Sequence, residues 1–128
     1  MKKKFILVMA VVCTLVFSVS GVAMAGDTAK GEAIFKKKKC KQCHNFTEKK
    51  KVGPGLKGVT SRHSEGWLVK WLMNPQKTWA ENDAETQELR KWRADRAKAK
   101  KTRMKIKKPP LTEEETKDLI AFLKEKTS

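Results

Sequence analysis

The sequence predicts an all-α fold in which about four helices form one small domain. Three observations lead to this fold class. Apolar residues recur at helical spacing in separate stretches, residue types that cap helices precede those stretches, and none shows the apolar–polar alternation of a half-buried strand. The chain has 128 residues, which suits a single domain once an N-terminal leader is set aside.

The first 25 residues are typical of a secretory signal peptide. Three lysines, an apolar run over 5–19 and the small-x-small sequence Ala23-Met24-Ala25 occur in the order that export and cleavage require. We therefore expect cleavage after Ala25, a periplasmic location and a mature domain over 26–128. The alternative is an uncleaved membrane anchor, but the apolar run is shorter than the roughly 20 residues of a spanning helix.

The predicted mature domain is strongly basic. Three of the 30 basic residues lie in the leader, which leaves 27 against 14 acidic residues. This excess of positive charge indicates what kind of partner the domain binds, and it says nothing about the fold. Because an exported protein seldom meets nucleic acid, acidic proteins and anionic membrane surfaces are the better candidates. A lysine-rich face that only keeps the domain soluble is the alternative.

One motif carries chemistry, the C-x-x-C-H sequence from Cys40 to His44. This is the attachment pattern of a c-type haem. Residues three apart lie on one face of a helical turn, so the sulfurs of Cys40 and Cys43 can both reach one flat ligand through thioether bonds. His44 is then placed to bind the iron as the proximal ligand. The motif predicts one covalent haem c.

Two other readings of these residues are weaker. A zinc site needs about four ligands, and the mature chain offers only Cys40, Cys43, His44 and His63. The adjacent Cys43 and His44 would have to bind one small ion together, which is awkward. A thioredoxin-like redox pair would need a βαβ pattern around it, and the flanking sequence has none.

The first helix is expected over 26–39, capped by Asp27 or Thr28. Gly31 interrupts its apolar stripe, which makes sense if another helix crosses closely there. A loop over 45–60 follows the haem motif, with dense turn signals from Val52 to Leu56. We expect this loop to close over His44 and to supply a backbone carbonyl for its second ring nitrogen.

A second helix is predicted from Ser64, its cap, to Asn74, with Pro75 ending it. Its broad apolar face is formed by Trp67, Leu68, Trp71 and Leu72.

A third helical pattern covers 82–101, where Asn82 and Glu85 resemble a capping box. Its apolar content is thin, and Leu89 and Trp92 are its main anchors. The basic stretch 90–108 is either a docking surface or a hydrated one.

Residues 101–110 should be irregular because Pro109-Pro110 blocks a helix. The last helix then begins at a capping box formed by Thr112 and Glu115. Its buried face is predicted from the spacing of Leu119, Ile120, Phe122 and Leu123.

These parts, in this order, resemble the class I c-type cytochromes, the small soluble monohaem electron carriers. The matching pieces are Gly31 and Phe35; Cys40-Lys41-Gln42-Cys43-His44; Val52-Gly53-Pro54-Gly55-Leu56-Lys57-Gly58; Trp67-Leu68 with Asn74-Pro75; and Leu111-Thr112-Glu113-Glu114-Glu115 with Leu119-Ile120-Ala121-Phe122-Leu123. The resemblance implies a cytochrome c-like fold wrapped around the haem. It also implies that the first and last helices cross, with Gly31 close to the region of Phe122.

The resemblance further implies a second axial ligand, a Met on an irregular loop shortly before the last helix. Met104 stands there, while Met73 and His63 are the alternatives. Pro54 belongs to the loop that contacts the haem in this family. Arg62 stands where the family often has a basic residue that pairs with a haem propionate, a role that suits a guanidinium group.

The function implied is one-electron transfer between redox proteins, with basic residues around the haem edge docking on acidic partners. Such a carrier is not itself an enzyme. The alternatives are a haem enzyme or gas-binding sensor with an open or displaceable distal ligand, or the electron-delivery subunit of a larger redox complex.

Overall fold

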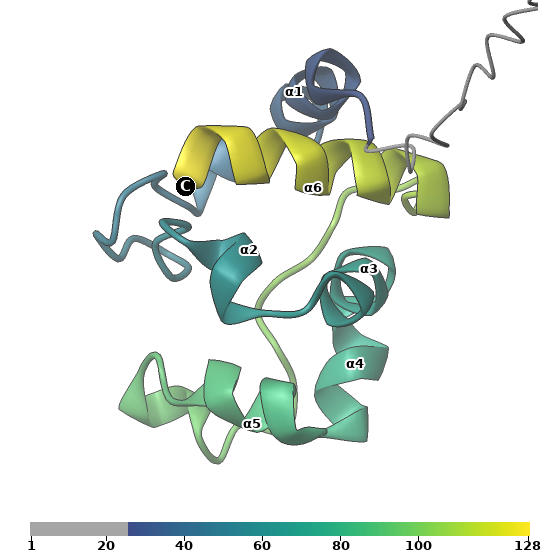
Figure 1. The fold of residues 1–128 in the computed structure, drawn as a ribbon. Coiled ribbons are helices and arrows are strands. Elements are labelled where there is room, and N and C mark those ends of the chain that lie inside the picture. The colour runs from purple at the N-terminus through teal and green to yellow at the C-terminus, as the bar shows by residue number, and fades with distance from the viewer. Residues whose placement is uncertain (1–25) are drawn as a thin grey trace, which may run out of the picture.

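The computed structural model describes residues 26–128, and the predicted signal peptide lies outside the described residues. Every regular element in that part of the chain is helical, which confirms the all-α class (Figure 1). The elements are α1 (Thr28–Lys37), η1 (Cys40–Gln42), α2 (Val59–Arg62), α3 (Glu65–Met73), α4 (Pro75–Glu81), α5 (Ala84–Arg90), η2 (Ala94–Arg96) and α6 (Glu113–Thr127).

The predicted crossing of the first and last helices is present, and α1 lies directly against α6 (Figure 1). Gly31 is buried at the crossing. A Cβ atom on it would lie 2.7 Å from the Cβ of Phe122 and still closer to the carbonyl oxygen of Asp118. Asp27 caps α1 as expected, and its backbone N–H donates to the Asp118 carboxylate at 2.7 Å. A residue without a side chain is therefore required where the two helix backbones meet.

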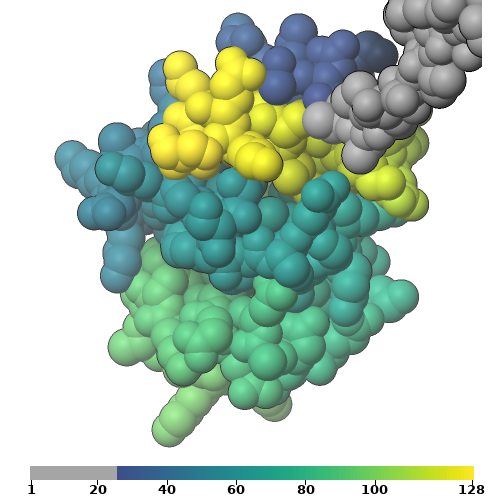
Figure 2. Space-filling view, viewed as in Figure 1, coloured from purple at the N-terminus to yellow at the C-terminus, as the bar shows by residue number. Residues whose placement is uncertain are grey.

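The hydrophobic core lies between this helix pair and the helices below it. Figure 2 shows the described chain stacked in bands on one face, with α1 and α6 above α2 and α3, and the segment that follows α4 below them. The buried apolar residues are Phe35, Val59, Trp67, Leu68, Trp71, Leu72, Trp79, Leu111, Leu119, Ile120, Phe122 and Leu123. The apolar faces predicted for the second and last helices are thus buried in the structure.

Pro75 lies at the junction of two helices, α3 and α4. It ends α3 as predicted, but it also begins α4, a helix that the sequence analysis missed. Asn74 lies at both junctions, and its side chain accepts a hydrogen bond from the Lys77 N–H at 3.1 Å. Proline suits the first position of a helix because that N–H has no partner inside the helix.

The predicted continuous helix over 82–101 is wrong, and so is its capping box. Asn82 ends α4 in a left-handed conformation with φ of 50°, and Asp83 caps the short α5 by accepting from the Thr86 N–H at 2.9 Å. The Glu85 carboxylate instead accepts hydrogen bonds from the backbone N–H and the hydroxyl of Ser64. With few apolar residues to bury, this stretch forms only α5 and the single turn η2.

The last helix begins at the predicted capping box. Thr112 accepts from the Glu115 N–H at 3.2 Å, and the Glu115 carboxylate accepts from the Thr112 N–H at 2.9 Å. No helix within 26–128 combines the length and the apolar character needed to cross a membrane.

Candidate haem site

A cavity of about 320 Å³ opens between η1, the end of α4, and the chain that leads from α5 to α6. Its volume falls within the range of roughly 300–1,000 Å³ found for ligand and cofactor sites. Five of the predicted site residues line it: Cys40, Cys43, His44, Pro54 and Met104. The lining does not include Arg62, Met73 or His63.

The haem motif forms one tight turn of the cavity wall. The backbone N–H groups of Cys43 and His44 both donate to the carbonyl of Cys40 at 3.1 Å. Both cysteines are free thiols, with Cys40 half-buried and Cys43 exposed. Burial raises the pKa of the Cys40 thiol to about 11, so that thiol is neutral at pH 7. The turn thus brings two sulfurs and an imidazole to one side of the cavity.

The imidazole of His44 is oriented by the loop that follows the motif. Its Nδ1 lies 2.8 Å from the carbonyl oxygen of Pro54. Because a carbonyl only accepts, Nδ1 carries the proton of this bond and Nε2 of the neutral ring remains an acceptor. Burial lowers the pKa of His44, against the opposing effect of the bond to Pro54. The predicted backbone carbonyl for the second ring nitrogen is therefore confirmed.

Close packing of this loop depends on a small residue beside the ring. A Cβ atom on Gly53 would lie 2.8 Å from Nδ1 of His44 and nearer still to its Cε1. Gly53 also donates its N–H to the carbonyl of Cys43 at 2.7 Å. The glycine allows the backbone to approach the face of the ring and so holds the imidazole in place.

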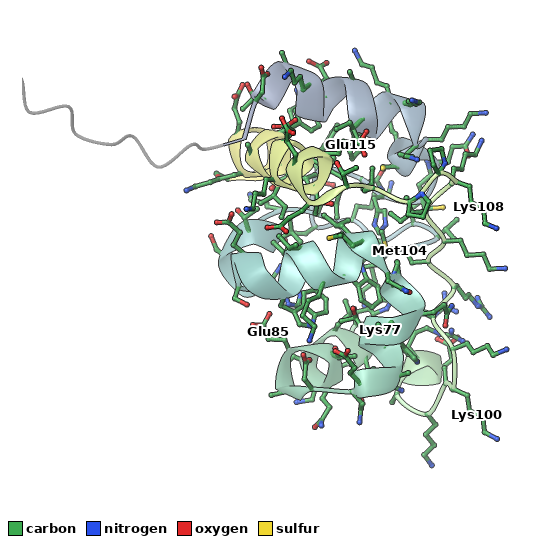
Figure 3. The ribbon with its side chains drawn as sticks, turned by 90° about the vertical axis from the view of Figure 1, so that its right-hand side faces the viewer. Lys77, Glu85, Lys100, Met104, Lys108 and Glu115 are labelled. Carbon is green, nitrogen blue, oxygen red and sulfur yellow. The ribbon has the colours of Figure 1, made fainter. Side chains whose placement is uncertain are left out.

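Met104 is half-buried in an irregular part of the chain that forms another part of the cavity wall. Figure 3 shows it on the chain that runs beside the helices, between Lys100 and Lys108. Its Sδ accepts a hydrogen bond from Nε1 of Trp71 at 3.0 Å, and its N–H donates to Oγ1 of Thr102 at 3.1 Å. A side chain of α3 thereby fixes the position of the Met104 sulfur.

The two alternative distal ligands lie elsewhere. Met73 is 39% exposed at the end of α3. The ring of His63 stacks on Trp67, with 4.4 Å between centroids, and its Nδ1 lies 3.5 Å from a Glu85 carboxylate oxygen. Of the three candidates, Met104 is the one that shares a cavity with His44.

The loop that carries Met104 is tied to the end of α1. The Lys38 ammonium group donates to the carbonyl of Lys107 at 2.6 Å and to that of Pro109 at 2.5 Å. Since Lys38 is two residues from Cys40, these bonds join the part of the wall with the haem motif to the part with Met104.

Positive charge reaches the cavity from residues that the sequence analysis did not single out. Arg93 and Arg96 line it, and both pair with Asp95, whose pKa is held far below its usual range, chiefly by the hydrogen bonds from Arg93. Arg62 is exposed and donates to the carbonyl of Gly55 at 2.8 Å. Its pairing with a haem propionate stays a prediction. For Arg93 and Arg96, the only signal in the sequence was their place in the basic stretch 90–108.

The donor set of this cavity fits a haem. It offers two thiols for covalent attachment, an imidazole Nε2 with no competing proton, and a thioether sulfur for the iron. Arg93, Arg96 and Arg103 bring guanidinium groups to the cavity wall, the first two paired with Asp95, and Leu89, Trp92 and Ile106 contribute apolar surface.

Comparisons with known proteins agree with this arrangement. The family model described as cytochrome c matches residues 28–127. The chain is 36% identical to cytochrome c2 iso-2 of Rhodospirillum centenum over 121 residues, which covers 78% of this chain and 95% of that protein. It is 34% identical to a cytochrome c of Chlamydomonas reinhardtii, with 83% of this chain and 95% of that one covered. An engineered cytochrome c from Rhodothermus marinus shares the fold, with a TM-score of 0.57, 20% identity, and coverage of 78% of this chain and 76% of that chain.

Proposed function

Because the chain belongs to the cytochrome c family, we propose that it is a periplasmic carrier of single electrons between redox proteins. The family carries a covalently bound haem c, which supplies an iron that changes between its ferric and ferrous states. The observation that supports a carrier most directly is the placement of His44 and Met104 in the wall of one cavity.

In this proposal the chain holds its cofactor at four points. Cys40 and Cys43 would hold the haem through thioether bonds, and the His44 imidazole and the Met104 sulfur would hold its iron. The Pro54 carbonyl fixes the His44 tautomer, and the Trp71 N–H fixes the position of the Met104 sulfur. With the iron held by two protein side chains, no open site would be left for a substrate, as suits a carrier rather than an enzyme.

A titration with carbon monoxide tests this closed coordination. We expect the reduced holoprotein to show little change in its visible spectrum over minutes at neutral pH, because Met104 occupies the distal position. Rapid and tight binding would favour the alternative function, a haem enzyme or gas sensor with a displaceable ligand. Co-purification with a larger redox assembly would instead indicate an electron-delivery subunit.

The charge around the cavity supports docking on acidic partners. Seven of its 20 lining residues are basic and none is acidic: Lys38, Lys39, Arg93, Arg96, Arg103, Lys105 and Lys107. Lys39 and Lys107 lie so close that their side-chain contact, and then the repulsion between their charges, lowers the pKa of Lys107. Nitrogen-tipped side chains project along this edge between Lys100 and Lys108 (Figure 3). An anionic membrane surface would meet the same face.

Salt should therefore slow electron transfer to negatively charged reactants. With ferricyanide as an anionic oxidant, we expect the rate of oxidation of the reduced holoprotein to fall as ionic strength rises. Lys105→Glu should flatten this dependence more than Lys30→Glu, which makes the same charge change on an exposed residue of α1 outside the cavity wall. Equal effects of the two substitutions would contradict docking at the cavity.

A further inference from the structure

The segment from Asn82 to Arg103, here called the connecting segment, leads from the end of α4 to Met104. It contains α5 and η2. In the described part of the chain, α5 shares no extended interface with another helix, unlike the pairs α1–α6 and α3–α6. The path of the connecting segment toward Met104 must therefore depend on individual side-chain contacts.

Two of those contacts converge on one backbone carbonyl. The half-buried guanidinium of Arg90 donates through Nη1 to the carbonyl of Ala99 at 2.9 Å and through Nη2 to that of Trp79 at 3.0 Å. The indole N–H of Trp79 donates to the same Ala99 carbonyl at 2.9 Å. Arg90 also lies over the Trp79 ring, 4.0 Å from its centroid. The end of α5, the end of α4 and the returning chain are joined at this point.

A third contact is made at Thr102, two residues before Met104. The side-chain amide of Gln76, in α4, donates to the carbonyl of Thr102 at 2.6 Å. The hydroxyl of the same threonine, which is buried, accepts the N–H of Met104 at 3.1 Å. A connected path of bonds thus runs from α4 through Thr102 to the backbone of Met104.

We infer that Arg90 and Gln76 are positioning residues that keep the Met104 sulfur at the cavity wall. The inference rests on the proposed role of Met104 as an axial ligand. The chain around Met104 is irregular and has no helical hydrogen bonds of its own, so side chains hold it. Trp71 bonds to the sulfur and Lys38 to the chain that follows, while Arg90 and Gln76 hold the chain that precedes it. When these bonds are removed, Met104 should leave the iron more often, while the haem stays attached through Cys40, Cys43 and His44.

Imidazole binding to the ferric holoprotein measures how often the distal position opens. Its apparent affinity scales with the fraction of molecules in which Met104 is displaced. We expect Arg90→Met and Gln76→Met each to raise that affinity by roughly tenfold, which corresponds to about 1.4 kcal/mol.

Two neighbouring residues provide matched controls. Lys91→Met removes the same charge from the exposed neighbour of Arg90. Gln87→Met removes an exposed glutamine that donates to the carbonyl of Asn82, away from Met104. Both controls should leave the affinity unchanged.

A double-mutant cycle with Met104→Ala separates this role from general stability. If Arg90 acts through Met104, adding Arg90→Met to Met104→Ala should not raise the imidazole affinity further. A lower unfolding temperature with unchanged affinity in Arg90→Met would overturn the inference, and so would an equal gain in both backgrounds. If Met104→Ala itself left the spectrum and the affinity unchanged, the ligand assignment would fail first, and the positioning role with it.

Discussion

Replacing Met104 with alanine should open one face of the haem iron and leave the haem attached. The oxidised holoprotein is expected to lose the weak far-red absorption band of a Met–iron bond. The reduced form should bind carbon monoxide at least about 100-fold more tightly, or by about 2.7 kcal/mol, because no protein atom then competes for the distal position. The reduction potential should also fall, since a Met ligand raises it.

The two alternative ligands provide matched controls for this experiment. Met73→Ala removes a methionine that is 39% exposed at the end of α3, and His63→Ala removes a ring that stacks on Trp67 outside the cavity. Both variants should keep the far-red band and remain inert to carbon monoxide. If the band instead survived in Met104→Ala and vanished in one of these, the distal ligand would have to be reassigned to that residue.

The second large effect is expected where α1 crosses α6. Gly31→Ala would place a methyl group against the Asp118 carbonyl and 2.7 Å from the Cβ of Phe122. Both obstacles belong to the backbone or the base of a side chain, so neither can rotate away. We expect the free energy of unfolding of the holoprotein to fall by about 3 kcal/mol, the upper part of the range for overpacked cores. Urea denaturation followed at the haem absorbance would measure it.

Gly66 provides a control for the change from glycine to alanine itself. It lies in the first turn of α3, and a Cβ atom there would meet nothing within 4 Å. Gly66→Ala should raise the free energy of unfolding by about 0.5 kcal/mol, because alanine loses less backbone entropy in a helix. A similar loss of stability for both substitutions would show that the helix crossing does not need a bare backbone at Gly31.

Much of this site could be predicted from local sequence. The spacing of Cys40, Cys43 and His44 already indicates which atoms face one ligand, because a single turn determines it. The same holds for the Thr112–Glu115 capping box and for the buried face of α3, whose period depends only on helical geometry. The family resemblance added the irregular position of Met104 and the close approach at Gly31.

The connecting segment is where local sequence failed. Its apolar residues are too sparse for a clear periodic signal, and the single helix predicted over 82–101 depended on the apparent capping box of Asn82 and Glu85. The helix α4, which precedes this segment, was missed because Pro75 both ends α3 and begins α4. Glu85 shows the reason. Its spacing from Asn82 matches a capping box, but in the folded chain its carboxylate bonds to Ser64, which lies 21 residues away in sequence.

By itself the sequence determined the helical class, the covalent haem motif and the basic character of the domain. Tertiary structure alone decided that Trp71 donates to Met104 across 33 residues, that Arg90 and Trp79 meet at the carbonyl of Ala99, and that Arg93 and Arg96 face the cavity while Arg62 does not. The physical reason is that helical periodicity reports which side of a segment is buried. The donor that meets a given carbonyl or sulfur depends on how the connecting chain folds back, and neighbouring residues do not encode that path.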